Sequence, residues 1–155
     1  MTPIEAINNS FLRGTSRSGK KHFLWMGDPV GIGSFLEQGW DGVHVSENPG
    51  HAKSLTSIRA EVGVDPHFLQ MLSGEWVRTV TPSEIINQFP GPYELIWIDI
   101  PERNRMLWYS HTIQEALPFI YVIPEDGHNE DVVNAARNRG YGRYIAEDRL
   151  ILTHS

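Results

Sequence analysis

Two features near the start of the chain have the residue types needed to bind a nucleotide-like ligand. An apolar run at residues 23–26 leads into a turn rich in glycine, and the next apolar run, at residues 43–45, is followed by Glu47. The glycines of the turn are Gly27, Gly31 and Gly33. Glycine lets the backbone approach a ligand closely, and a carboxylate accepts hydrogen bonds from the vicinal hydroxyls of a ribose. Together they predict a ribose-bearing ligand, although Glu47 has a second interpretation as a partner for the start of a helix after Pro49.

Acid–base and charged groups follow the later apolar runs. Asp99 ends the run YELIWIDI and is a candidate to orient or deprotonate an acceptor, while a neutral His128 could take the same proton. Arg103 and Arg105 could clamp an anionic acceptor, because a guanidinium binds a carboxylate or phosphate through two hydrogen bonds. Each has a plainer interpretation. Asp99 could cap a helix or pair with one of these arginines, and the arginines and His128 could simply be solvated.

A group of acids around His128 raises the question of a metal site. Its members are Asp126, His128, Glu130 and Asp131. Such ligands suit a divalent cation, but acids also gather in the first turn of a helix because they complement its dipole. We predict no metal here. The absence of cysteine excludes disulfides and cysteine-bearing zinc sites.

Apolar periodicity predicts the elements that position these residues. Strands are expected at residues 22–26, 42–47, 76–80, 93–100 and 119–123. Helices are expected at residues 3–12, with Thr2 as N-cap, and at 34–38, 51–62, 102–116 and 129–139, with a short helix starting at Pro82. Residues 65–74 are interpreted as a short helix or an irregular insertion. The runs 143–147 and 149–153 predict a closing hairpin.

This order of elements predicts a doubly wound α/β fold with a mostly parallel, Rossmann-like sheet, helices on both faces and a C-terminal antiparallel strand pair. One domain over residues 1–155 is expected, with an N-terminal helix and basic loop at 1–21 and the core at 22–155. Ligands of such sheets sit at the carboxyl ends of the strands, where Gly27, Glu47, Asp99 and His128 are all expected. A receiver-type domain has a similar alternation, but it needs an acidic pair after the first strand, and Asp28 stands alone.

Composition narrows the classes of partner. The net charge of -6 argues against extensive nucleic-acid binding, which relies on many phosphate contacts. A basic segment at residues 13–21 is either an arm for an anionic substrate or a solvated linker. No signal peptide or apolar run of membrane-spanning length is apparent, so a cytoplasmic protein that does not bind membranes is expected.

The chain resembles the class I S-adenosylmethionine-dependent methyltransferases. Residues 31–36, GIGSFL, look like the glycine loop of that family, Glu47 matches its ribose-binding acid, and the Asp99-Ile100-Pro101 segment occupies its fourth-strand motif. The resemblance implies that S-adenosylmethionine is the cofactor, a small-molecule methyl donor. It would be bound by Gly27, Asp28, Gly31, Gly33, Ser34, Glu47 and Asn48. An acceptor would face Asp99, His128, Pro101, Arg103 and Arg105.

The chain also departs from the family pattern. Pro29 stands where the first glycine of the loop is usual, and Asp99 does not begin the Asn/Asp-Pro-Pro-aromatic motif of nucleic-acid amino methyltransferases. The motif is nearer to the IDxP form of relatives that modify small molecules or sugars. Two alternatives stay open: a binding protein on a degenerate methyltransferase fold, and an enzyme that cleaves S-adenosylmethionine itself. The acceptor and the oligomeric state are not predicted.

Overall fold

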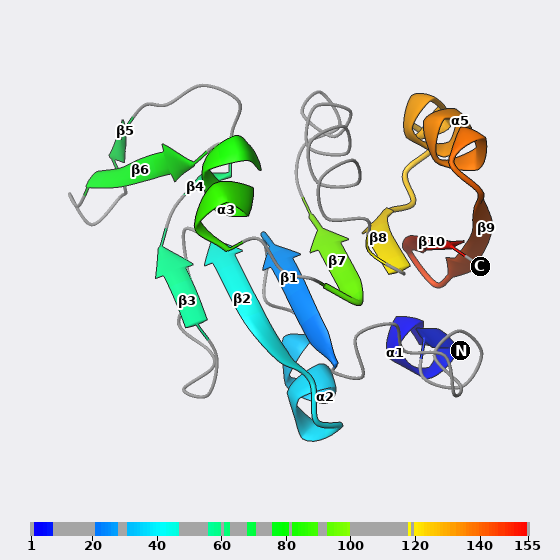
Figure 1. Ribbon diagram of the computed structural model, residues 1–155, viewed down its shortest axis with the longest axis horizontal. Helices are drawn as coiled ribbons and strands as arrows, with labels where there is room; N and C mark the ends of the chain where they lie inside the picture. Colours follow the sequence, from blue (N-terminus) through cyan, green and yellow to red (C-terminus); the bar gives the residue numbers. More distant parts are fainter. Residues whose placement is uncertain are drawn as a thin grey trace.

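A seven-stranded, mostly parallel sheet forms the centre of the protein (Figure 1). The computed structural model describes residues 2–7, 21–27, 31–46, 56–59, 61–62, 68–70, 76–80, 82–89, 93–99, 118 and 120–154. Across the sheet the strands are β3 (Thr56–Arg59), β2 (Asp41–Ser46), β1 (His22–Met26), β7 (Leu95–Ile98), β8 (Ile120–Pro124), β10 (Arg149–His154) and β9 (Tyr141–Ala146). The first five are parallel to one another, and β10 is antiparallel to both β8 and β9. The predicted fold class is therefore confirmed.

The order of the strands creates a switch point between β1 and β7. The chain passes from β1 outward to β2 and β3, and then returns to the other side of β1 to form β7 and β8. Sheets wound in this way leave a crevice at the carboxyl ends of the two strands on either side of the switch point. The residues that follow β1 and β7 are therefore placed where a ligand can enter.

The central strands are apolar because they are buried on both faces. Every described residue of β7 is buried, as are the last four of β1 and the first four of β8. Continuous apolar runs are typical of such strands, which explains why the predictions for 22–26, 93–100 and 119–123 are confirmed. The closing hairpin is confirmed as well, since β9 and β10 pair directly.

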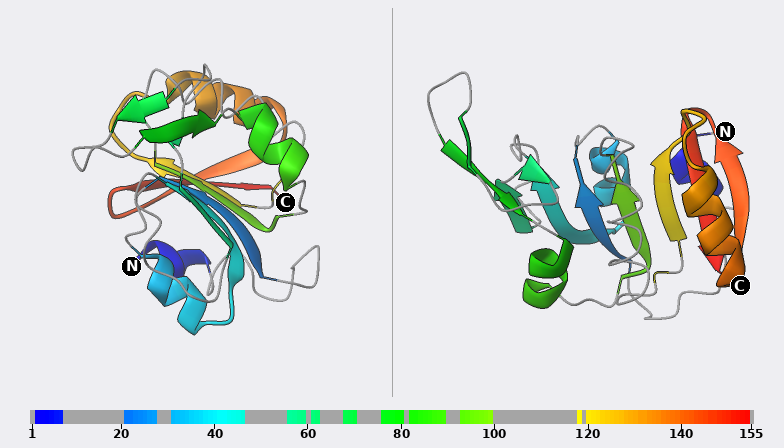
Figure 2. Two further views of the ribbon diagram at one scale, coloured as in Figure 1. Left: turned by 90° about the vertical axis from the view of Figure 1, so that its left-hand side faces the viewer. Right: turned by 90° about the horizontal axis from the view of Figure 1, so that it is seen from above.

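Helices cover both faces of the sheet (Figure 2). On one face lie α1 (Pro3–Ala6) and α2 (Ile32–Glu37), and on the other lie α3 (Pro82–Gln88) and α5 (Glu130–Asn138). Trp25, Phe35 and Trp97 belong to the core of the first face, and Ile85, Val132 and Leu150 to that of the second. The Thr2 N-cap is confirmed, since the Glu5 backbone N–H donates to Thr2 Oγ1 at 3.3 Å.

A small second sheet corrects part of the prediction. It consists of β4 (Glu61–Val62), β6 (Trp76–Val80) and β5 (Phe68–Gln70). The helix predicted over residues 51–62 is wrong where the structure describes this segment, because 56–59 and 61–62 are strands. The strand predicted at 76–80 exists but pairs with β4 and β5. The edge of the main sheet beside β2 is formed by β3. Residues 65–74 contain the short strand β5.

The helix predicted at 102–116 lies wholly outside the described residues. Residues 8–12 of the helix predicted at 3–12 also lie outside them. No helix of the described ranges is long and apolar enough to cross a membrane.

Candidate functional site

The end of β1, at Met26 and Gly27, is held at the switch point by both neighbouring strands. Its backbone N–H donates to the carbonyl of Val45 in β2 at 2.9 Å, and the Asp99 N–H donates to the carbonyl of Met26 at 2.8 Å. The φ of Gly27 is +105°, and a Cβ added there would lie 2.4 Å from the carbonyl oxygen of Asp99. Only glycine fits this close approach of β1 to the end of β7.

A buried histidine fixes the orientation of the Gly27 peptide. His44 of β2 is 1% exposed, and its Nε2 lies 3.0 Å from the Gly27 carbonyl oxygen. Because a carbonyl can only accept a hydrogen bond, we assign the proton of this bond to Nε2. His44 was not predicted as a site residue, because it is the central residue of an apolar run and belongs to no motif.

Asp99 follows β7 and forms an ion pair with Arg149, the first residue of β10. Arg149 Nη2 donates to Asp99 Oδ2 at 3.1 Å, and the side chains are 14% and 28% exposed respectively. The register explains the contact: continuing the β7–β8 pairing past Trp97 and Val122 by two residues leads to Asp99 and Pro124, and β10 pairs Pro124 with Arg149. The expected local partners, Arg103 and Arg105, lie outside the described residues. Arg149 is therefore a site residue that sequence reasoning missed.

Two stacked tryptophan side chains pack against Arg149. The rings of Trp25 and Trp97 are stacked with centroids 4.1 Å apart and an interplanar angle of 7°, and the Arg149 guanidinium lies 5.0 Å from the centre of the Trp97 ring. Since Trp25 covers one face of the Trp97 ring, we place Arg149 over the other. This arrangement adds a cation–π contact to the ion pair with Asp99.

A groove of about 580 Å³ opens beside this stack, on the face covered by α1 and α2. Its lining residues come from α1, α2, β7 and the β9–β10 turn, and they are Thr2, Pro3, Glu5, Gly31, Ser34, Phe35, Glu37, Gln38, Trp97, Glu147, Asp148 and Arg149. The turn lies at the carboxyl end of β8, because the Glu125 N–H donates to the Asp148 carbonyl at 2.9 Å. The groove therefore begins at the edge of the sheet where the ligand was expected.

The structure brings some predicted residues together and separates others. Gly31 and Ser34 line the groove, whereas Gly33 is exposed on α2 with open space where a side chain would be. His128 is exposed and does not line the groove, and its backbone N–H donates to Asp126 Oδ1 at 3.1 Å. The remaining predicted residues lie outside the described ranges, and they are Asp28, Glu47, Asn48, Pro101, Arg103 and Arg105. Their roles stay predictions.

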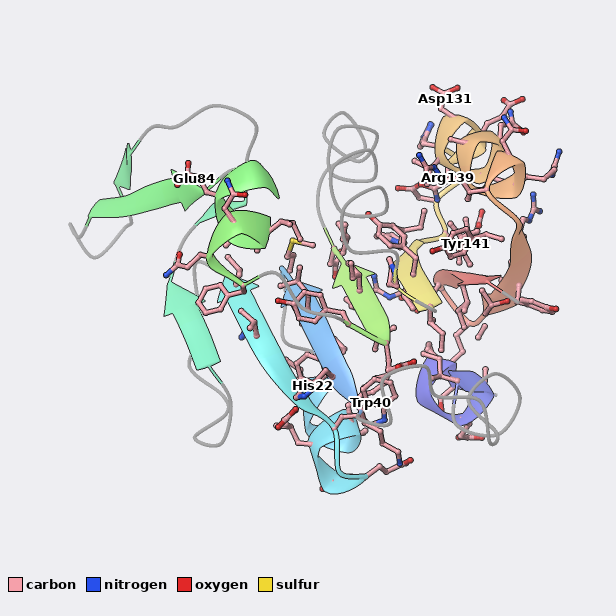
Figure 3. The ribbon with its side chains drawn as sticks, in the orientation of Figure 1. His22, Trp40, Glu84, Asp131, Arg139 and Tyr141 are labelled. Atoms are coloured by element: carbon pink, nitrogen blue, oxygen red, sulfur yellow. The ribbon has the colours of Figure 1, made fainter. Side chains whose placement is uncertain are left out.

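The acids around His128 fit the start of a helix. Glu130 and Asp131 occupy the first turn of α5, where they complement the helix dipole, and Asp131 points away from the body of the protein (Figure 3). Within the part of the chain that the structure describes, no three His, Asp or Glu side chains are grouped so that they could hold a metal ion.

Comparisons with solved structures identify the fold. The chain is similar to MycE, a methyltransferase from the mycinamycin biosynthetic pathway solved in complex with Mg and SAH, with a TM-score of 0.60 and 10% identity over 98% of this chain. It spans only 45% of that chain. It is also similar to a chain of the fibrillarin/Nop5p complex, with a TM-score of 0.50 and 10% identity over 92% of this chain and 77% of that one. No known protein family and no curated protein matches the sequence. The protein thus has an α/β, Rossmann-like methyltransferase fold.

Proposed function

We propose that this protein binds S-adenosylmethionine and transfers its methyl group to a small acceptor. The observation that carries the proposal is the sheet, in which an antiparallel β10 is inserted between β8 and β9 in a doubly wound order. Its likeness to a methyltransferase chain solved with SAH supports this choice over other nucleotide-binding sheets. The glycine at the switch point supports it too, because the backbone there can approach a bound donor closely.

The donor would be held by the segment from Gly27 to Ser34, together with Glu47 and Asn48. When bound, S-adenosylmethionine supplies a methyl group on a sulfonium, which is already a good electrophile. The protein has chiefly to align donor and acceptor and to exclude competing orientations. In this respect the backbone of Gly27 is held by two hydrogen bonds to β2: its N–H donates to the Val45 carbonyl, and its carbonyl accepts from His44 Nε2.

Asp99 is the candidate that would orient the acceptor or receive its proton. Arg149 fixes the carboxylate of Asp99 at the edge of the sheet through the 3.1 Å hydrogen bond, so the carboxylate does not need to be ordered by the substrate. His128 stays a second candidate from the sequence, and Pro101, Arg103 and Arg105 stay candidates for acceptor binding.

Product analysis tests the proposed reaction. The protein is incubated with methyl-labelled S-adenosylmethionine, with and without a cell metabolite extract, and the products are separated by chromatography. We expect S-adenosylhomocysteine to accumulate only when the extract is present. Cleavage products formed without the extract would indicate the donor-cleaving alternative, and binding without any product would favour the degenerate binding protein.

An Asp99→Asn variant tests the role of the carboxylate in the same assay. If Asp99 receives the acceptor proton, turnover should fall by roughly 10²-fold or more while donor affinity stays unchanged. Glu130→Gln, an exposed acid on α5, is the matched control and should keep full turnover. Equal turnover of Asp99→Asn and wild type would remove Asp99 from the mechanism.

A further inference from the structure

β9 is an edge strand with exposed apolar side chains. It is the last strand of the seven-stranded sheet, it pairs only with β10 among the described strands, and it lies at the outer margin of the molecule (Figures 1 and 2). Tyr144 and Ile145 are 50% and 55% exposed, and within the described ranges they are the large apolar side chains that are exposed. An edge strand presents backbone N–H and C=O groups that can pair with another chain. β9 therefore offers both hydrogen-bonding groups and apolar surface to a further strand.

The exposed side chains lie on both faces of β9. Tyr141 is buried in the core on the α5 side of the sheet, and Ala146 is buried in the core on the α1 and α2 side. Successive side chains of a strand alternate between the faces, so Ile145 shares the side of Tyr141, and Tyr144 shares the side of Ala146. The four residues between the buried ends are all exposed. A strand beside β9 would therefore cover apolar area on both faces.

Charges of opposite sign lie at the two ends of β9. Arg137, in the last turn of α5, and Arg139 come just before the strand, and Arg143 lies in its first half. Glu147 and Asp148 follow its last residue, and all five side chains are exposed. When two identical strands pair in antiparallel fashion across a two-fold axis, the start of each lies beside the end of the other. The arginines of one copy would then lie near the acids of the other, so this edge is complementary to itself.

We infer that β9 pairs with β9 of a second copy of this chain, antiparallel and with Tyr144 at the two-fold axis. Tyr144 of one copy lies opposite Tyr144 of the other, and Arg143 lies opposite Ile145. The pairing covers residues 142–146, which all belong to β9, and it joins the two sheets into one. Glu147 of the second copy is the diagonal neighbour of Arg143, within reach of its long side chain.

The charges and the bounds of β9 select this register. Residues directly opposite each other in an antiparallel pair lie on the same face, so the two-fold axis passes through one residue position. An axis at Arg143 would place two like charges opposite each other, which is destabilising. Axes at Gly142 or Ile145 would pair Tyr144 or Arg143 with a residue outside the strand. A charge in an edge strand commonly prevents pairing, whereas here Arg143 excludes one register and supports another.

The contact is small, so the dimer is weak. Each copy contributes one short strand with two large apolar side chains, and we expect a dissociation constant of about 10–100 μM. The hydrophobic cores on both sides of the sheet lie within one chain. Unfolding measured at about 1 μM protein therefore follows the single chain.

Sedimentation equilibrium over about 5–500 μM protein measures the association. We expect the wild type to dimerise in this range. Tyr144→Lys places two ammonium groups opposite each other at the axis and should weaken the dimer by at least about 10-fold. Gln38→Lys adds the same charge at an exposed position after α2, and as the control it should dimerise like the wild type. Circular dichroism checks that both variants are folded.

A charge exchange tests the complementarity of the two ends. Arg143→Glu places like charges near each other and should weaken the dimer by about 3- to 10-fold. Adding Glu147→Arg to the same chain restores opposite signs across the contact and should recover most of the lost affinity. A double variant that dimerises no better than Arg143→Glu alone would contradict the proposed contact.

Cross-linking tests the register. The chain has no cysteine, so a single introduced cysteine reports only its own symmetry mate. Tyr144→Cys places two thiols opposite each other at the axis, and mild oxidation should cross-link it at least about 10-fold faster than Ile145→Cys, whose symmetry mates are diagonal neighbours. A wild type that stays monomeric at about 500 μM, a dimer that Tyr144→Lys leaves unchanged, or faster cross-linking of Ile145→Cys would overturn the inference.

Discussion

Gly27 joins three strands at the point where a bound donor would lie, and its replacement is expected to be costly. In Gly27→Ala the new Cβ would meet the Asp99 carbonyl, 2.4 Å away, and the residue would keep a φ of +105° that alanine disfavours. We expect a loss of roughly 1–3 kcal/mol in the free energy of unfolding, measured by urea denaturation.

Gly33→Ala is the matched control for this loss. Gly33 lies in α2, and a Cβ added there would meet nothing within 4 Å. In the interior of a helix, alanine is more favourable than glycine by up to about 1 kcal/mol. This variant should therefore be as stable as wild type or slightly more stable. Equal losses in the two variants would contradict the assigned role of Gly27.

The ion pair of Asp99 and Arg149 is expected to contribute to stability. Arg149→Met keeps an aliphatic side chain near Trp97 but leaves the Asp99 carboxylate, which is 28% exposed, without its partner. We expect a loss of about 1–2 kcal/mol in the free energy of unfolding, allowing for partial solvent screening. Arg143→Met, at an exposed position of β9, is the control and should change the free energy of unfolding by less than about 0.5 kcal/mol.

A double-mutant cycle checks the physical reason. Combining Arg149→Met with Asp99→Asn removes both charges, so the double variant should be more stable than the sum of the two single losses implies. Strict additivity would mean that the two side chains do not interact in solution.

At the residue scale, the sequence predicted Asp99 as a candidate site residue but did not predict its partner. The candidates considered, Arg103 and Arg105, are near in sequence, whereas Arg149 is 50 residues away. Their contact depends on β10 lying beside β8 with Arg149 opposite Pro124, and no local pattern specifies that register. His44 was missed for a similar reason, because its partner is a backbone carbonyl of another strand.

At the scale of elements, Tyr93 connects the end of α3 to the start of β7. Its hydroxyl donates to the Phe89 carbonyl at 2.6 Å, and burial raises the pKa of this hydroxyl to about 12 from its usual 10.0. Above pH 10 the unfolded chain therefore loses this proton while the folded protein retains it. Stability from this group is complete below pH 10 and is lost as the pH rises toward 12.

Tyr93→Phe isolates this contribution. We expect the variant to be less stable at pH 7 by about 0.5–1.5 kcal/mol, because it lacks the hydrogen bond, and to lose less stability than wild type between pH 9 and roughly pH 11. Urea denaturation across this pH range measures both effects. Tyr144→Phe, at a side chain that is 50% exposed, is the control. Parallel pH profiles for Tyr93→Phe and wild type would show that Tyr93 does not titrate as described.

Elements buried on both faces were predictable, and edge elements were not. Long apolar runs specify β1, β7 and β8 because no other placement would bury them. The segment 51–62 has apolar residues at helical spacing, yet β3 and β4 within it have four residues and two. Strands this short show too little alternation to be recognised, and pairing of β3 with the open edge of β2 determines its structure.

At the scale of the whole molecule, the layers and the winding of the sheet were predictable from the order of elements, but strand partners were not. β6 was recognised as a strand, yet it belongs to a second sheet with β4 and β5. Apolar patterns indicate that a strand needs partners without indicating which. The groove depends on the same long-range information, because α1, α2 and the β9–β10 turn meet only in the folded protein.

Calorimetric titration of the purified protein with S-adenosylmethionine and S-adenosylhomocysteine tests most directly the claim that this protein binds S-adenosylmethionine. We expect saturable binding of both with a dissociation constant of roughly 1–100 μM. In Glu47→Gln, which weakens the proposed ribose contact, affinity should fall by about 10-fold or more. Absence of binding by ligand-free wild-type protein at millimolar donor would contradict the claim.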